Sequence, residues 1–194
     1  MTLIPPGIDP RTWLAERLPA PDAVLPGDEV EPQRPAAVLI PVVARPDGAT
    51  ILLTVRSSGL KRHAGQISFP GGRVDAGDAS LVAAALRETE EETGITPNFI
   101  TPVGRLEATE SITGFLMFPI VGVVREGFMP RANPGEVDEI FEVPFAFVMD
   151  PGNHREETAM IAGQERRYWR IPFGRYDIWG ATARILVNLS LRLR

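Results

Sequence analysis

The chain has 194 residues, of which 44% are hydrophobic and 23% are charged, as in an ordinary globular protein. Its 20 basic and 25 acidic residues give a net charge of -5, which argues against non-specific nucleic-acid binding. The absence of cysteine excludes disulfides and thiolate metal sites, and two histidines are too few for an ordinary histidine-based zinc site.

No segment has the pattern of a membrane span or an export signal. The longest apolar run, Ala36–Ala44, is too short to cross a bilayer and contains Pro41. Pro5 and Pro6 interrupt the N-terminus where a signal peptide needs a continuous apolar stretch. We therefore expect a cytoplasmic protein with no nucleic-acid or membrane partner. We also expect a monomer or homodimer.

The first 35 residues are rich in proline and read as an arm in front of one domain over residues 36–194. Asp9 and Pro10, followed by Arg11–Leu18, predict a short N-capped helix with proline in its first turn. The stretch Pro19–Pro35 reads as an extended connection. We assign this arm to packing or to an oligomer contact rather than to chemistry.

The domain begins with a predicted β-hairpin, formed by Ala36–Ala44 and Thr50–Arg56 around the turn Pro46-Asp47-Gly48. A short strand over Gln66–Phe69 ends in Pro70-Gly71-Gly72. Further strands are expected around Val103–Ala108, Phe115–Val124 and Arg166–Ile171, with a short helix near Pro144–Met149 and a longer one over Tyr176–Leu193. Strands around two substantial helices predict an α/β (α+β) sandwich with a mixed sheet.

A second helix, over Ala79–Thr93, carries the densest acidic run of the chain. We expect Asp78 at its N-cap and Gly94 just after its end. Three glutamates at i, i+3 and i+4 share one face of it, within a turn of each other: Glu88, Glu91 and Glu92. Like charges at this spacing repel, and a hard divalent cation such as Mg²⁺ or Mn²⁺ would neutralise them. A solvated acidic face is the alternative for an isolated run of this kind.

This helix and the turn before it resemble the signature of the Nudix hydrolases. The second half of that signature is matched by Arg87, Glu88, Glu91, Glu92, Gly94 and Ile95. Thr89 stands at an aliphatic position, and Asp78 follows Gly72 where the signature has glutamate, with one extra residue before Arg87. The resemblance implies a Nudix-like α/β/α sandwich, Mg²⁺ or Mn²⁺ on the three glutamates, and an arginine at position 87 that orients a glutamate. We assign Asp78 to helix capping in preference to metal binding.

Positive charge is concentrated just before the acidic helix, at Arg56, Lys61, Arg62 and His63. A phosphate-rich substrate could bridge the two regions, held by cations at one end and by a metal at the other. The alternative is a solvated basic loop that balances nearby carboxylates.

The same upstream stretch resembles the motif of the coenzyme A pyrophosphatase branch of the Nudix family. The matching residues run from Leu52-Leu53-Thr54-Val55-Arg56-Ser57 to Phe69-Pro70-Gly71-Gly72, with Lys61 where the branch has arginine. Ile178–Ala183 is similar to the closing helix of the branch. The implied reaction is hydrolysis of the diphosphate of coenzyme A or an acyl derivative to 3′,5′-ADP and a 4′-phosphopantetheine product. The implied substrate-binding residues are Arg56, Lys61, His63, Phe69, Gly71 and Gly72.

Three glutamates outside the helix are candidates for the general base. Residues 133–139 are expected to form a loop that could swing over the site and carry Glu136 and Glu139, while Glu110 lies beside a predicted strand end. Three aromatic residues are candidates for stacking on adenine, with a core position as the alternative for each: Phe69, Phe115 and Trp179.

Three other functions stay open at this point. The chain could hydrolyse ADP-ribose or another nucleoside diphosphate derivative, although the upstream motif weighs against this. It could be a non-catalytic Nudix-fold binding module, but such a module would be marked by loss of a helix glutamate, and all three are present. Or it could be a plain α/β scaffold with a solvated acidic face.

Overall fold

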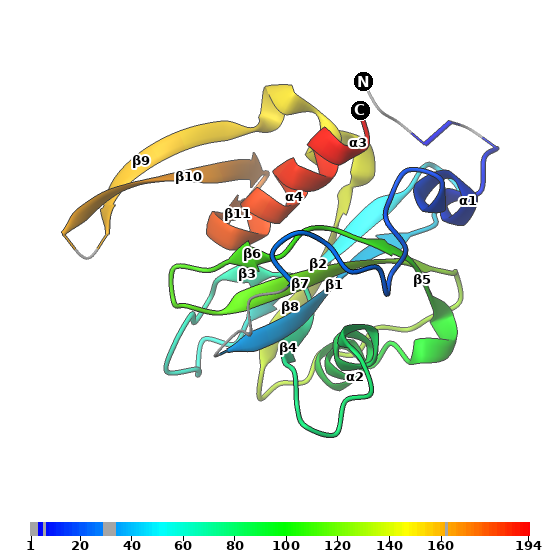
Figure 1. Cartoon of the computed structure of the whole chain (residues 1–194), viewed down its shortest axis with the longest axis horizontal. Helices are drawn as coiled ribbons and strands as arrows, with labels where there is room; N and C mark the ends of the chain where they lie inside the picture. The colour runs from blue at the N-terminus through cyan, green and yellow to red at the C-terminus, as the bar shows by residue number, and fades with distance from the viewer. Residues whose placement is uncertain (1–3, 6, 29–33, 162) are drawn as a thin grey trace.

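The computed structural model describes residues 4–5, 7–28, 34–161 and 163–194 (Figure 1). Within these ranges, eight strands form one mixed sheet in the order β3-β2-β1-β7-β5, to which β4, β6 and β8 add by pairing with β1, β7 and β2. The strands of this sheet are β1 (Pro35–Val43), β2 (Thr50–Arg56), β3 (Ile67–Ser68), β4 (Gly71–Arg73), β5 (Ile100–Arg105), β6 (Thr109–Glu110), β7 (Leu116–Val124) and β8 (Val137–Pro144).

Along one of its edges β1 pairs first with β4 and then with β2, and this change of partner positions the site. The predicted hairpin is confirmed, because β1 and β2 pair antiparallel with Val42 opposite Ile51. Only the far end of β1 pairs with β2, however, and its first part pairs with β4, with Val38 opposite Gly71. On its other side β1 runs parallel to β7. The segment from β3 to β4 therefore crosses from β2 to β1 in the middle of the sheet.

Helices cover both faces of the sheet (Figure 1). The helix α2 (Leu81–Thr93) packs on one face against Ala37 and Leu39, while Val38 and Ile40 belong to the core cluster on the other face. Successive side chains of a strand point to opposite faces, so one apolar strand supplies both cores. The second face carries α1 (Pro10–Ala15), α3 (Phe145–Met149) and α4 (Gly180–Arg192), and short 3-10 turns lie at Pro97–Phe99 and Pro151–Asn153. The predicted α/β/α sandwich is confirmed.

A second sheet of three strands leans away from the body of the protein (Figure 1). It consists of β9 (Arg155–Ile161), β10 (Gln164–Phe173) and β11 (Tyr176–Trp179). The helix expected from Tyr176 is therefore wrong over its first four residues. Ile178 lies opposite Ile171 in the register of β10 and β11, and both side chains are fully buried, so tertiary packing selects the strand there.

The first part of the N-terminal arm packs on the sheet. The helix α1 begins as expected, since Asp9 Oδ1 accepts a hydrogen bond from the Arg11 amide at 2.9 Å. Trp13 and Leu14 of this helix are buried in the same core cluster as α4. Residues 29–33, part of the predicted extended connection, lie outside the described residues. None of the described helices is long and apolar enough to cross a membrane.

Candidate active site

The acidic helix α2 begins at Ser80 rather than at Asp78. The Ser80 hydroxyl accepts a hydrogen bond from the Ala83 amide at 3.1 Å, which is the geometry of a side-chain N-cap. The expected cap at Asp78 is therefore wrong. The C-terminal prediction is confirmed, because Gly94 ends the helix in the left-handed conformation, at φ 69°. Thr89, the polar residue at the aliphatic position, is fully buried and donates its hydroxyl to the Ala85 carbonyl.

Asp78 instead binds Arg87. The guanidinium donates two hydrogen bonds to the Asp78 carboxylate, each of 2.9 Å, and they form a fork. The second oxygen of Asp78 also accepts from the Asp75 amide and so closes the turn before the helix. The hydrogen bonds from Arg87 lower the pKa of Asp78 to about 2, with the backbone bond as the second cause. Asp78 thus anchors an arginine of the site, a role its spacing alone did not show.

Arg87 connects the acidic face of the helix to this anchor. Its Nη1 lies 2.9 Å from Glu88 Oε1 and 3.3 Å from Glu91 Oε2, and its Nη2 donates to the Arg73 carbonyl at 3.2 Å. The pKa of Arg87 is raised, first by the hydrogen bond to Asp78. That Arg87 orients a glutamate stays a prediction, since its fork of donors binds Asp78. The contacts of Nη1 hold the Glu88 carboxylate close to the Arg87 guanidinium and turn the Glu91 carboxylate toward the same group.

Glu92 is the most buried of the three glutamates, with 2% of its side chain exposed. Burial raises its pKa to about 7, and the charges of Glu136 and Glu88 act in the same direction. Two contacts oppose the shift: the Gly71 amide donates to Oε2 at 3.2 Å, and Arg56 Nη1 lies 3.6 Å from Oε1. A residue at the end of β2 and a residue at the start of β4 therefore both contact the Glu92 carboxylate of α2.

Glu88 lies against the glycine pair of β4. Its side chain is 15% exposed, and burial raises its pKa against the lowering effect of Arg87. A Cβ atom at Gly72 would lie 2.3 Å from Glu88 Oε2, and one at Gly71 would lie 2.5 Å from the Ala37 carbonyl oxygen. Both glycines permit a close approach that any side chain would obstruct. We find them packing β4 against α2 and β1.

The remaining residues of the upstream motif occupy the loop that joins β2 to β3. Lys61, Arg62 and His63 are exposed there, and the His63 imidazole Nδ1 lies 2.8 Å from Gln66 Oε1. The loop closes on the end of β2, where the Gly65 amide donates to the Arg56 carbonyl. Phe69 is 3% exposed and belongs to the core, so the expected stacking on a substrate is wrong for this residue.

The expected mobile loop over residues 133–139 is only partly present. Glu139 lies on β8, opposite Val55, and accepts hydrogen bonds from the Tyr176 hydroxyl at 2.6 Å and from Arg175. Glu136 stays in the turn before β8, where its carbonyl accepts from the Ser57 amide, and its charge acts on both Glu88 and Glu92. Of the three candidate bases, Glu136 is thus the one next to the acidic cluster, while Glu110 is on β6.

The other two candidate stacking residues make ring contacts with residues outside the acidic helix. The Phe115 ring contacts the Arg34 guanidinium at 4.3 Å from its centroid. Trp179 is 36% exposed and meets the Tyr168 ring edge-on, with the ring centroids 6.0 Å apart. Neither contact involves α2 or β4.

Comparison with known proteins decides the family. A family model described as NUDIX domain matches residues 32–162, which is more than half of the chain. The chain belongs to the Nudix family. It is 44% identical over 161 residues to the protein described as Uncharacterized Nudix hydrolase NudL from Salmonella paratyphi B, with 83% of each chain covered, and the protein of that description from Salmonella newport gives the same values. The crystal structure of the Nudix hydrolase RenU from M. Smegmatis covers 59% of this chain and 72% of its own, with a TM-score of 0.48 and 21% identity.

Nudix hydrolases generally need divalent cations such as Mg²⁺ or Mn²⁺. Among the described residues, no three carboxylate, histidine or cysteine side chains converge into a ready-made metal site. Glu88 and Glu92 nevertheless fit a hard cation, because both are oxygen donors whose negative charge is disfavoured by burial. Glu91 is 52% exposed and points to Arg87, so it joins them only after leaving that ion pair.

Proposed function

We propose that this Nudix protein is a metal-dependent pyrophosphatase that hydrolyses the diphosphate of coenzyme A or an acyl derivative. The products are 3′,5′-ADP and a 4′-phosphopantetheine compound. One observation carries the proposal: Arg56 of the upstream motif lies 3.6 Å from Glu92 of the Nudix helix. This contact links the motif on which the resemblance to the coenzyme A branch rests with the acidic helix, and so supports the proposal. We expect the reaction to take place in the cytoplasm.

The acidic side of the site holds the metal in this proposal. Glu88 and Glu92 would hold Mg²⁺ or Mn²⁺, with Glu91 as a third ligand, and the ion would supply positive charge to the phosphoryl oxygens and lower the pKa of the attacking water. Arg87, held by its fork on Asp78, keeps Glu88 in position, while Glu91 leaves its ion pair with Arg87 to join the metal. Gly71 contributes its amide to Glu92, and Gly72 provides the space in which Glu88 lies.

The basic side of the site holds the substrate. Arg56 ends β2 beside Glu92 and binds a phosphoryl oxygen of the diphosphate. Lys61 and His63, exposed on the loop after β2, contact the remaining phosphate oxygens. Lysine acts as a point charge where arginine would form a fork, so Lys61 contributes less to orientation than the arginine of the branch motif.

Glu136 is the general base in this proposal. Its carboxylate takes a proton from water, the water oxygen attacks one phosphorus atom, and the bond from that phosphorus to the bridging oxygen breaks. Support comes from its place in the turn before β8, where its charge acts on both Glu88 and Glu92. Replacement by glutamine is expected to lower kcat by about 100-fold or more, as for loss of a positioned base.

The test is a product assay with coenzyme A, ADP-ribose and NADH as substrates, each with Mg²⁺ and with Mn²⁺. We expect release of 3′,5′-ADP from coenzyme A and slower turnover of the other two. No release of 3′,5′-ADP under either metal would overturn the proposal. Turnover of ADP-ribose alone would assign the chain to the nucleoside diphosphate pyrophosphatases, and ligand binding without any turnover would assign it to the binding modules.

A further inference from the structure

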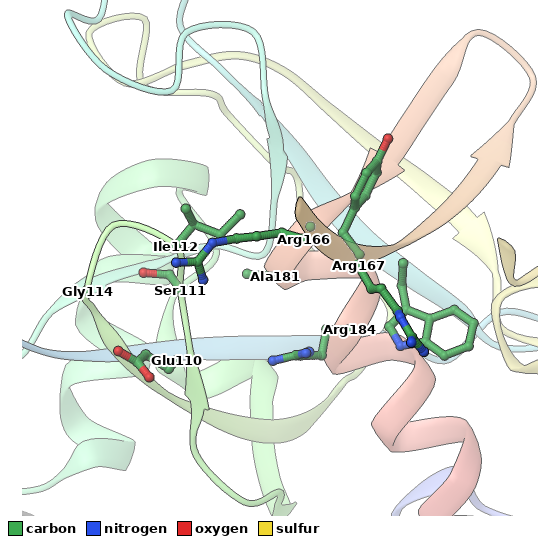
Figure 2. Close-up of a pocket in the computed structure, with 11 residues that line it drawn as sticks. Glu110, Ser111, Ile112, Gly114, Arg166, Arg167, Ala181 and Arg184 are labelled. Atoms are coloured by element: carbon green, nitrogen blue, oxygen red, sulfur yellow. The ribbon is translucent and has the colours of Figure 1, made fainter. Parts of the chain in front are cut away.

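A cleft of about 370 Å³ lies beside α4. It is bounded by the turn after β6, by β10 and by the first turns of α4 (Figure 2). Arg166 and Arg167 of β10 and Arg184 of α4 line it, together with Glu110. Three guanidinium groups and one carboxylate thus line the cleft, which leaves it positive on a chain whose net charge is -5.

Arg184 and Arg167 are available to a ligand. The Arg184 side chain has no hydrogen bond or ion pair with any residue that the structure describes. Arg167 is 77% exposed, and its ion pair with Glu156 is 3.9 Å long. In Figure 2, Arg166 and Arg184 extend from two different elements toward the turn that carries Ser111. Gathered like charges repel, and a phosphate that accepts from two guanidinium forks would relieve that repulsion.

Two further features of the walls suit a phosphorylated nucleotide. The helix α4 starts at Gly180 without a side-chain cap and without an acidic residue in its first turn, so its amide end adds to the positive field at the cleft. Tyr168 and Trp169 also line the cleft and offer flat, partly exposed rings near the arginines. Planar rings of this kind stack on nucleotide bases.

The cleft and the acidic site are close neighbours in the fold. The Thr182 hydroxyl of α4 donates to the Ile67 carbonyl of β3 at 3.0 Å, and β3 leads directly into the Gly71 amide that binds Glu92. Across the sheet, β6 is separated from β4 by β7 and β1, three strand spacings or about 14 Å. One extended substrate can span an interval of this length and so contact both sites.

We propose that this cleft binds the 3′-phosphate of the nucleotide half of coenzyme A, with Arg184 and Arg166 as the phosphate ligands. The inference rests on the proposed function and gives it a basis for specificity, because ADP-ribose and NADH carry a diphosphate but no 3′-phosphate. Arg184 and Arg166 are then specificity-determining residues that touch the substrate away from the reacting phosphorus atom.

The experiment compares kcat/KM for coenzyme A and for dephospho-coenzyme A, which lacks the 3′-phosphate. The wild type, Arg184→Gln, Arg166→Gln and the control Arg192→Gln are measured, the last being an exposed arginine at the far end of α4. We expect each cleft variant to lose about ten- to hundredfold on coenzyme A and less than twofold on dephospho-coenzyme A. The control keeps both values. Equal losses on the two substrates, or no loss, would overturn the inference.

Calorimetric titration of the same proteins with 3′,5′-ADP and with 5′-ADP separates this inference from the proposed function. Tighter binding of 3′,5′-ADP that depends on Arg184 supports the cleft as a phosphate site even if coenzyme A is not hydrolysed, in which case the proposed function alone fails. If coenzyme A is hydrolysed but the binding of 3′,5′-ADP does not depend on Arg184 or Arg166, the inference about the cleft alone is overturned.

Discussion

Gly72 and Glu88 lie so close that a single added methyl group cannot fit between them. A Cβ atom at Gly72 would lie 2.3 Å from Glu88 Oε2 and 2.4 Å from its carboxyl carbon. The obstructed atoms are the end of a flexible side chain, so a larger residue would displace the carboxylate rather than the backbone. The glycine therefore determines where a proposed metal ligand lies.

Gly72→Ala is expected to lower kcat by about 100-fold, because displacing a catalytic group by about 1 Å can reduce the reaction rate by that factor. The free energy of unfolding should change by less than about 1 kcal/mol, since Glu88 can turn away. Steady-state turnover and urea unfolding are the measurements. Gly77→Ala is the matched control, since a Cβ there meets nothing within 4 Å. Normal turnover in Gly72→Ala would contradict this role of the glycine.

Glu92→Gln is expected to abolish metal-dependent turnover, with a loss of about 1000-fold or more, while the fold stays intact. The amide nearly preserves the shape of the side chain but removes the negative charge that would bind the cation. Turnover is measured across a range of Mg²⁺ and Mn²⁺ concentrations, with circular dichroism as the check on folding. Glu90→Gln, at an exposed position of the same helix, is the control. Wild-type activity in Glu92→Gln would refute the assignment of the metal site.

The raised pKa of Glu92 predicts how the stability of the metal-free protein depends on pH. The folded state holds the Glu92 proton up to about pH 7, while the unfolded chain releases it near 4.5. Between these values the folded state binds more protons, so the contribution of Glu92 to stability is present below pH 4.5 and is lost as the pH rises toward 7. By linkage the loss is at most about 3 kcal/mol.

This loss is measured as the difference in unfolding free energy between wild type and Glu92→Gln, from pH 4.5 to 7.5 in the presence of a chelator. The wild type should lose stability relative to the variant as the pH rises, and added Mg²⁺ should restore it at pH 7. A difference that is independent of pH would show that the Glu92 carboxylate is not disfavoured by burial.

Asp78 and Ser80 are expected to have separate roles, although two residues apart. Asp78→Asn weakens the fork that holds Arg87 and should lower kcat by about tenfold or more. Ser80→Ala removes the helix cap and should cost about 1 kcal/mol of stability with little change in kcat. Turnover and thermal unfolding of both variants test the distinction. The reverse pattern would restore Asp78 as the cap.

Local patterns were sufficient to predict the hairpin, the acidic helix and its ending at Gly94, because these depend on residues close together in the chain. The i, i+3, i+4 spacing alone placed Glu88, Glu91 and Glu92 on one helical face. The helix predicted over residues 176–179 and the loop predicted over residues 137–139 were wrong for the opposite reason. Both segments are strands that β10 and β2 stabilise from elsewhere in the chain.

The sequence by itself determined that three glutamates would share a helical face after a Gly-Gly turn and a basic segment. Only the tertiary structure decided what each of these groups touches. Arg56 contacts Glu92, 36 residues further along the chain, and Asp78 binds Arg87 instead of capping the helix. Both contacts depend on the pairing of β4 with β1, which brings β2, β4 and α2 together. The spacing of charges along a helix is a local property, whereas their burial and their partners depend on contacts between distant segments.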